Sequence, residues 1–160
     1  MLKVKIIAMG KLTETFFRDA ADEYLTRLGR HFQVTVVEPK PELLPNNPSD
    51  AVIKAALERE EAKIKAEIPP RAAVVAMCVE GKQLSSEEFS EKLSDFALSG
   101  YSEVVFVIGS SHGLSDGVKS IAKMKLSVSK MTFPHELFRV MLLEQLYRAG
   151  EISAGSKYHK

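Results

Sequence analysis

The segment Gly109–Gly113 reads GSSHG and matches the G-x-S-x-G pattern of a nucleophilic serine on a sharp turn after a strand. In such a site a histidine takes the proton of Ser111 and an acid orients the histidine. The candidate partners are Asp116 with His135 or His159. Asp116 follows Ser111 by only five residues, and no glycine-rich segment upstream supplies an oxyanion hole. The alternative is a tight turn whose glycines let a ligand approach the backbone.

A second candidate is the run Val128–Phe133, which reads VSKMTF and leads through Pro134 into an apolar segment. A proline is favoured at the start of a helix because its missing amide hydrogen is not needed there. The run is therefore either the lead-in to a buried helix or a surface on which a ligand binds. The apolar pattern by itself leaves both interpretations open.

The basic residues are concentrated in the C-terminal third, although the net charge of the chain is only +1. Residues 117–130 contain no acid and four lysines, Lys119, Lys123, Lys125 and Lys130, whereas residues 58–67 are rich in acids. A local basic face suits contact with the phosphates of a nucleic acid. The alternative is an ordinary solvated surface.

Metal and disulfide chemistry are not indicated. The four histidines and Cys78 show no spacing typical of metal ligands, and Cys78 lies within an apolar strand pattern, which predicts a small core residue. A single cysteine excludes an intramolecular disulfide and favours a reducing compartment. No segment approaches the roughly 20 apolar residues of a membrane span, so we expect a cytoplasmic protein without membrane contact.

The periodicity of apolar residues predicts elements that alternate along the chain. Strands are expected over 2–8, 33–38, 72–79, 103–109 and 125–129, and helices over 13–28, 50–67, 85–99, 118–124 and 135–149. This alternation is typical of an α/β domain, here 1–160, with a mostly parallel sheet and helices on both faces. The loops 109–116 and 129–135 then follow strand carboxyl ends, where open α/β sheets bind ligands.

Three stretches carry a family resemblance: VFVIGSSHGLS (105–115), LSVSKMTFPHELFRVMLLEQLYRA (126–149) and YHK (158–160). They closely resemble the small SPOUT-class methyltransferases that methylate N3 of a pseudouridine in bacterial 23S ribosomal RNA. The N-terminal KIIAMGK, Glu23-Tyr24 and GKQLSSEEF fit the same family, so the resemblance covers essentially the whole chain. Three positions depart from the family pattern: Ser110 replaces a second glycine, Gly150 an aromatic residue, and Ala154 an arginine.

The resemblance implies an S-adenosylmethionine-dependent enzyme, a homodimer, and a C-terminal trefoil knot. The strand pattern alone predicts an unknotted sheet, because threaded chains are rare. Carried over by position, the cofactor contacts are Met77, Gly109, Val128, Ser129, Lys130, Met131, Thr132 and Phe133. Backbone groups of the run would read the adenine edge, and its apolar side chains would enclose the ring.

The implied reaction needs a group that removes a proton, because an imide N3 is protonated at neutral pH. His159 has a suitable intrinsic pKa, Lys160 or Arg139 is expected to stabilise the imide anion, and Tyr158 to orient or stack on the base. The modest net charge favours the assembled ribosome over free ribosomal RNA as the partner. The alternative from another class is a non-catalytic RNA- or ribosome-binding module that uses the same basic face.

Overall fold

The computed structural model describes residues 1–160 as alternating strands and helices. The strands are β1 (Leu2–Ala8), β2 (Phe32–Val37), β3 (Ala73–Lys82), β4 (Val104–Ile108) and β5 (Met124–Leu126). The helices are α1 (Thr15–Leu28), α2 (Asp50–Ala66), α3 (Ser86–Leu98), α4 (Asp116–Ile121) and α5 (His135–Ser153). None of these helices is both long and apolar enough to cross a membrane.

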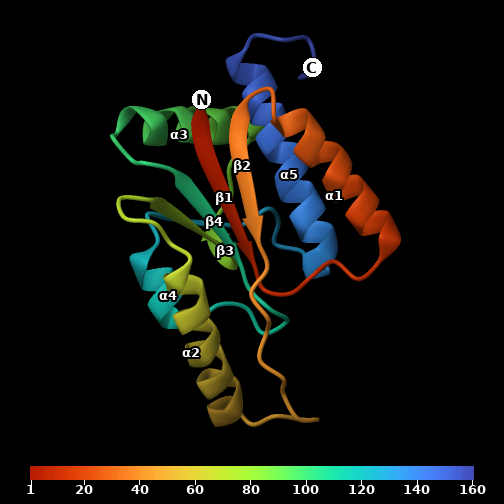
Figure 1. Cartoon of the computed structure of the whole chain (residues 1–160), viewed down its shortest axis with the longest axis vertical. Helices are drawn as coiled ribbons and strands as arrows, with labels where there is room; N and C mark the ends of the chain where they lie inside the picture. The colour runs from red at the N-terminus through yellow and green to blue at the C-terminus, as the bar shows by residue number, and fades with distance from the viewer.

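The strands form one five-stranded sheet in the order β2-β1-β4-β3-β5 (Figure 1). Every pairing between named strands is parallel. The mostly parallel α/β sheet expected from the alternating pattern is therefore confirmed. Because all five strands run the same way, their carboxyl ends, and the loops that follow them, lie at one edge of the sheet.

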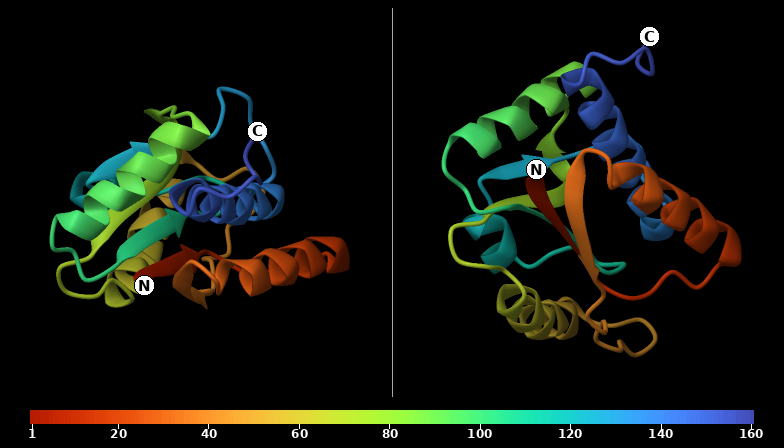
Figure 2. Two further views of the ribbon diagram at one scale, coloured as in Figure 1. Left: turned by 90° about the horizontal axis from the view of Figure 1, so that it is seen from above. Right: turned by 45° about the horizontal axis from the view of Figure 1, so that its top comes forward.

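Helices cover both faces of the sheet, as expected (Figure 2). Side chains alternate between the faces along each strand, so Phe106 enters one core and its neighbours Val105 and Val107 enter the other. The larger core lies beneath α1, α3 and α5, and the smaller one beneath α2 and α4. Strand β4 is buried at every position, which explains its continuous apolar sequence.

Two helices begin at serine caps, Ser49 for α2 and Ser85 for α3. Ser49 caps α2 by accepting a hydrogen bond from the amide of Val52 at 3.3 Å. At α3, Ser85 accepts from the amide of Glu88 at 3.1 Å, and the carboxylate of Glu88 accepts from the amide of Ser85 at 3.3 Å. This reciprocal pair is the capping box that the sequence predicts.

Several boundaries differ from the prediction in the C-terminal third, where α4 covers Asp116–Ile121 rather than 118–124. Strand β5 ends at Leu126 rather than at residue 129. The cause is local: the hydroxyl of Ser127 donates to the carbonyl of Ser129 at 2.8 Å, and the hydroxyl of Ser129 accepts from the amide of Met131 at 3.0 Å. These side-chain bonds compete with the sheet ladder and turn the chain. Helix α5 continues past residue 149 to Ser153.

Strand β3 also departs from the prediction, because it carries a bulge before its end at Lys82. Both Met77 and Lys82 are in register with Leu126 of β5, so residues 78–81 are looped out of the ladder. The backbone at Gly81 lies against the backbone of Leu126, and a Cβ at position 81 would lie only 2.6 Å from the carbonyl carbon of Leu126. The bulge therefore requires a residue without a side chain at position 81.

Gly81→Ala tests this requirement. The added methyl group meets backbone that cannot move independently, so we expect a loss of about 1–3 kcal/mol in the free energy of unfolding, measured by urea denaturation. Gly29→Ala is the matched control, because its Cβ would make an ordinary contact at 3.4 Å and its φ is −56°. Equal midpoints for the two variants would show that the bulge tolerates a side chain.

Candidate functional site

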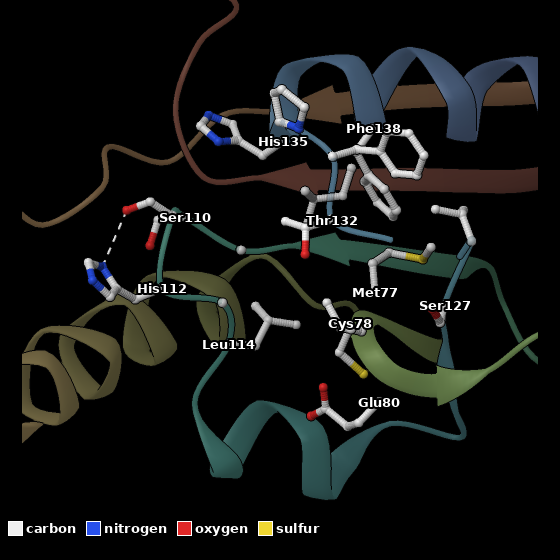
Figure 3. A pocket seen from close by; sticks show the side chains of 18 of the residues that line it. Met77, Cys78, Glu80, Ser110, His112, Leu114, Ser127, Thr132, His135 and Phe138 are labelled. Atoms are coloured by element: carbon white, nitrogen blue, oxygen red, sulfur yellow. Dashed lines mark hydrogen bonds between the residues drawn. The ribbon is translucent and has the colours of Figure 1, made fainter. Parts of the chain in front are cut away.

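One cavity of about 540 Å³ opens at the carboxyl edge of the sheet, where the chain leaves β3, β4 and β5 (Figure 3). Seven of the eight predicted cofactor contacts line it: Met77, Gly109, Val128, Ser129, Met131, Thr132 and Phe133. Lys130, the eighth, is exposed and does not line the cavity. The fold thus brings together residues from three separate parts of the chain.

The cavity wall combines apolar side chains with polar ones. Met77 on β3, Ile108 at the end of β4 and Phe138 on α5 line it from three elements. The two turn-forming serines, Ser127 and Ser129, also lie in its wall. The size of the pocket, and its mixture of apolar walls with hydroxyl and charged groups, suit a small-molecule site.

The loop after β4 is held by two neighbouring carboxylates of α2. The hydroxyl of Ser110 donates to Glu60 Oε1 at 2.7 Å, and the hydroxyl of Ser115 donates to Glu61 Oε1 at 2.6 Å. Glu60 is only 3% exposed, and its other oxygen accepts the amide of Glu42 at 2.9 Å. The hydrogen bond from Ser115, followed by that from Lys65, lowers the pKa of Glu61.

Sequence reasoning missed both of these carboxylates, because it treated the acid-rich stretch 58–67 only as a charge pattern. The available signal was the helical spacing, which places Ile64 one turn beyond Glu60 on the same buried face of α2. The hydrogen bond from Ser110 to Glu60 also shows how this chain accommodates a serine where the family has glycine.

The serine-nucleophile hypothesis is not supported by the geometry. Ser111 is exposed, and the only side-chain partner of its hydroxyl is Nδ1 of His112, at 3.3 Å. Asp116 begins α4, whereas His135 begins α5, and neither bonds to Ser111. The glycine pattern instead makes a tight turn, in which a Cβ on Gly109 would overlap the backbone of Gly113.

The opposite end of the cavity is formed by the bulge of β3. Cys78 is half-buried and lines the cavity, so the prediction that it is a core residue is wrong: the bulge turns it out of the sheet. Glu80 Oε1 lies 2.5 Å from Nζ of Lys119 on α4. The hydrogen bond from Lys119 lowers the pKa of Glu80, and the same bond raises the pKa of Lys119. Burial is the main cause of the raised pKa of Cys78.

The C-terminal tail folds onto α3 and α5 of its own chain. The hydroxyl of Tyr158 donates to Glu144 Oε1 at 3.1 Å, and the guanidinium of Arg148 lies 4.7 Å above the ring of Tyr158. His159 lies between Arg148, 3.2 Å from its Nδ1, and Glu87, 2.6 Å from its Nε2. Burial, followed by the hydrogen bond to Glu144, raises the pKa of Tyr158.

The tail and the cavity lie at opposite ends of α5. His135, the first residue of α5, lines the cavity, and the helix ends at Ser153 before the tail begins. A helix of 19 residues is about 28 Å long, and Figure 1 shows the C-terminus far from the start of α5. Tyr158 and His159 are therefore not brought to the cavity of their own chain.

Arg139 also lies away from the cavity. It is 5% exposed, and its Nη1 contacts Glu38 Oε2 at 2.5 Å while its Nη2 donates to the carbonyl of Gly10 at 2.6 Å. These bonds tie α5 to the segments that follow β1 and β2. Within one chain Arg139 makes the contacts of a structural residue, which the sequence did not predict.

The ring of His31 occupies the space beside Gly150, where another residue would have its side chain. A Cβ on Gly150 would lie 2.5 Å from Cγ of His31, whose ring packs 5.9 Å from that of Tyr147 and bonds to Glu151 at 3.0 Å. The hydrogen bond from Ser156 is the largest cause that lowers the pKa of Glu151 to about 2. The His31 and Tyr147 bonds lower it further, so this cluster anchors the end of α5.

A family model described as "Predicted SPOUT methyltransferase" matches residues 2–159. The chain belongs to the SPOUT methyltransferase family. "Ribosomal RNA large subunit methyltransferase H" of Streptococcus thermophilus (strain CNRZ 1066) is 45% identical to it, over 99% of this chain and 100% of the relative. The relative of the same name from Clostridium acetobutylicum is 46% identical over the same shares.

The structure of the SpoU methyltransferase AviRb from Streptomyces viridochromogenes is more distant: 15% identical, over 97% of this chain and 61% of that one, with a TM-score of 0.49. The family match confirms the resemblance carried by the three C-terminal stretches. SPOUT membership implies the trefoil knot in the C-terminal part of the chain. The strand pattern did not predict it, because threading is rare among folds.

Glu151→Gln is expected to destabilise this SPOUT domain at neutral pH. The folded-state pKa of Glu151, about 2, lies below the ordinary value of 4.5, so its ionised form stabilises the fold fully above 4.5. That stabilisation is lost as the pH falls through about 2. Thermal unfolding should therefore show a gap between wild type and variant at pH 7 that closes with acidification.

The control for this measurement is Glu91→Gln, which removes an exposed carboxylate of α3. Its thermal unfolding midpoint should equal that of the wild type at every pH. A gap for Glu151→Gln that stays constant down to the folded pKa would show that lost packing, and not the charge, is responsible.

Proposed function

We propose that this SPOUT methyltransferase uses S-adenosylmethionine to methylate N3 of a pseudouridine in 23S ribosomal RNA, on the assembled ribosome. The observation that carries the proposal is the convergence of seven predicted cofactor contacts on one cavity. The relatives that cover the full length carry a name that specifies a large-subunit ribosomal RNA methyltransferase. The exact base and the ribosomal substrate follow from the resemblance of the C-terminal stretches.

The cavity suits a nucleoside-based methyl donor. Its volume of about 540 Å³ lies within the range of small-molecule sites. Gly109 has no side chain to cover the backbone, and apolar Met77 and Phe133 line the cavity, where they are available to pack against a flat ring. Ser129 and Thr132 add polar groups at the rim. When bound, S-adenosylmethionine supplies a methyl group on a positively charged sulfur.

The protein must hold the target nitrogen in line with that methyl group and help N3 to lose its proton. We assign proton removal to the imidazole of His159 and base stacking to Tyr158. In the free chain Nδ1 of His159 faces the guanidinium of Arg148, and Nε2 faces the carboxylate of Glu87. Since a guanidinium only donates, Nδ1 accepts and Nε2 carries the proton. His159 must therefore leave Arg148 before it can accept a proton through Nδ1.

A homodimer resolves the distance between tail and cavity. The tail of one subunit would reach the cavity of its partner, so that each site combines residues of two chains. Helix α5 supports this arrangement, because Phe138, Val140 and Met141 are apolar and only partly buried in one chain. An apolar helix surface of this kind favours packing against a second copy.

The basic face provides the contact with RNA. Lys123, Lys125 and Lys130 are exposed, whereas Lys119 is engaged by Glu80. Three free lysines on a chain of net charge +1 give limited phosphate attraction. This balance favours a substrate whose shape adds contacts, such as the assembled ribosome, over a free RNA strand.

The first test combines donor binding with methyl transfer. We expect calorimetry to show one S-adenosylmethionine or S-adenosylhomocysteine bound per cavity, and mass mapping to show methylated pseudouridine on ribosomes but little on free ribosomal RNA. Thr132→Trp should abolish both by filling the cavity. Ribosome binding without donor binding would instead establish the non-catalytic module, and labelling of Ser111 by a fluorophosphonate would establish the hydrolase.

The second test separates the roles of tail and cavity. His159→Ala should lose turnover at saturating donor while its donor affinity is unchanged. A turnover that is unchanged across pH would remove the base role.

Co-expression of His159→Ala with Thr132→Trp should restore about a quarter of wild-type activity, because random pairing gives half mixed dimers, each with one complete site. Neither variant alone supplies such a site. Absence of rescue would show that tail and cavity of the same chain work together.

A further inference from the structure

The bulge of β3 places one ion pair in the cavity wall (Figure 3). Among the residues that line the cavity, Glu80 is the only carboxylate and Lys119 the only lysine or arginine. The remaining wall is apolar, hydroxyl-bearing or backbone, apart from two histidines. A charged pair at one end of such a cavity is a candidate for reading a polar part of the ligand.

The local structure aims Glu80 at this position. Residues 78–81 are looped out between two pairings to Leu126, and the ladder resumes with a bond from the amide of Ser127 to the carbonyl of Lys82 at 2.9 Å. Bulges next to functional sites commonly redirect a side chain. Gly81 makes the close approach possible, so the direction of Glu80 is built into the backbone.

Lys119 binds one oxygen of the Glu80 carboxylate, Oε1, and leaves the other, Oε2, available to a ligand. Its Nζ contacts Oε1 at 2.5 Å, and no other residue bonds to Oε2 of Glu80. The side chain of Glu80 is 53% exposed, so a ligand in the cavity can reach Oε2. The pair is electrically balanced, which suits a neutral hydrogen-bond donor better than an ammonium or carboxylate group.

We propose that Glu80 is the specificity residue that accepts hydrogen bonds from the ribose hydroxyls of the donor, with Lys119 as its positioning partner. The inference rests on the proposed function and deepens it. The adenine-reading run begins at Val128, two residues after the Leu126 that pairs with the bulge. A sugar attached to an adenine seated on that run therefore lies next to the bulge.

Calorimetry with three ligands tests the assignment: S-adenosylhomocysteine, its 2′-deoxyribose analogue, and 5′-methylthioadenosine, which keeps the ribose but lacks the amino-acid end. Glu80→Gln, which keeps the shape and removes the charge, should weaken S-adenosylhomocysteine and 5′-methylthioadenosine alike, by roughly ten- to hundredfold. The wild type should bind the deoxy analogue more weakly than the parent, and Glu80→Gln should lose most of that preference. Glu91→Gln should behave as the wild type.

Lys119→Met provides an independent readout of positioning. Without its cation the pKa of Glu80 is no longer held down, so the carboxylate protonates at a higher pH. We expect binding of 5′-methylthioadenosine to Lys119→Met to weaken on acidification at a higher pH than binding to the wild type. Superimposable pH profiles would remove the positioning role of Lys119.

The outcomes separate this inference from the function beneath it. A wild type that binds none of the three ligands overturns the proposed function, and this inference with it. Normal wild-type binding with no loss in Glu80→Gln overturns the ribose assignment alone. A loss confined to S-adenosylhomocysteine also overturns it, because Glu80 would then read the amino-acid end.

Discussion

The parallel alignment of β3, β4 and β5 is the constraint on which the rest of the structure depends. It carries three chain segments, far apart in sequence, to one edge of the sheet and leaves them to form a single cavity. Strand β4 is buried at every position, so a one-residue shift would exchange its side chains between the two cores and spoil the packing of both. The packing of the cores therefore fixes where the cavity lies, and the loops determine its shape.

Side-chain hydrogen bonds determine the shape of the loops that line the cavity. Ser127 and Ser129 turn the chain after β5, while α2 holds the loop after β4 through Glu60. The bulge of β3 depends on the absence of a side chain at Gly81. Each device fixes backbone direction at the cavity wall, so the groups that face a ligand are set before it binds, which lowers the entropic cost of binding.

Two of the three departures from the family pattern, Ser110 and Gly150, are accompanied by local contacts. Ser110 gains a buried acceptor in Glu60, and His31 occupies the space beside Gly150 and bonds to the next residue of α5. These contacts give the hydroxyl of Ser110 a hydrogen-bond acceptor and fill the space beside Gly150. The length of α5 has a different consequence, because it separates the tail from the cavity of the same chain. For this reason we propose that a second subunit supplies the tail.

The sequence by itself determined the α/β class, the order of the elements, the capped helix starts, and seven of the residues that line the cavity. These follow from local periodicity, cap chemistry and recognisable stretches of chain. Only the tertiary structure decided the early end of β5, the outward turn of Cys78, the structural bonds of Arg139 and the acceptor role of Glu60. Each of those depends on a partner distant in sequence or on a competing side-chain bond, and neither kind of partner is visible in a pattern read along one strand or helix.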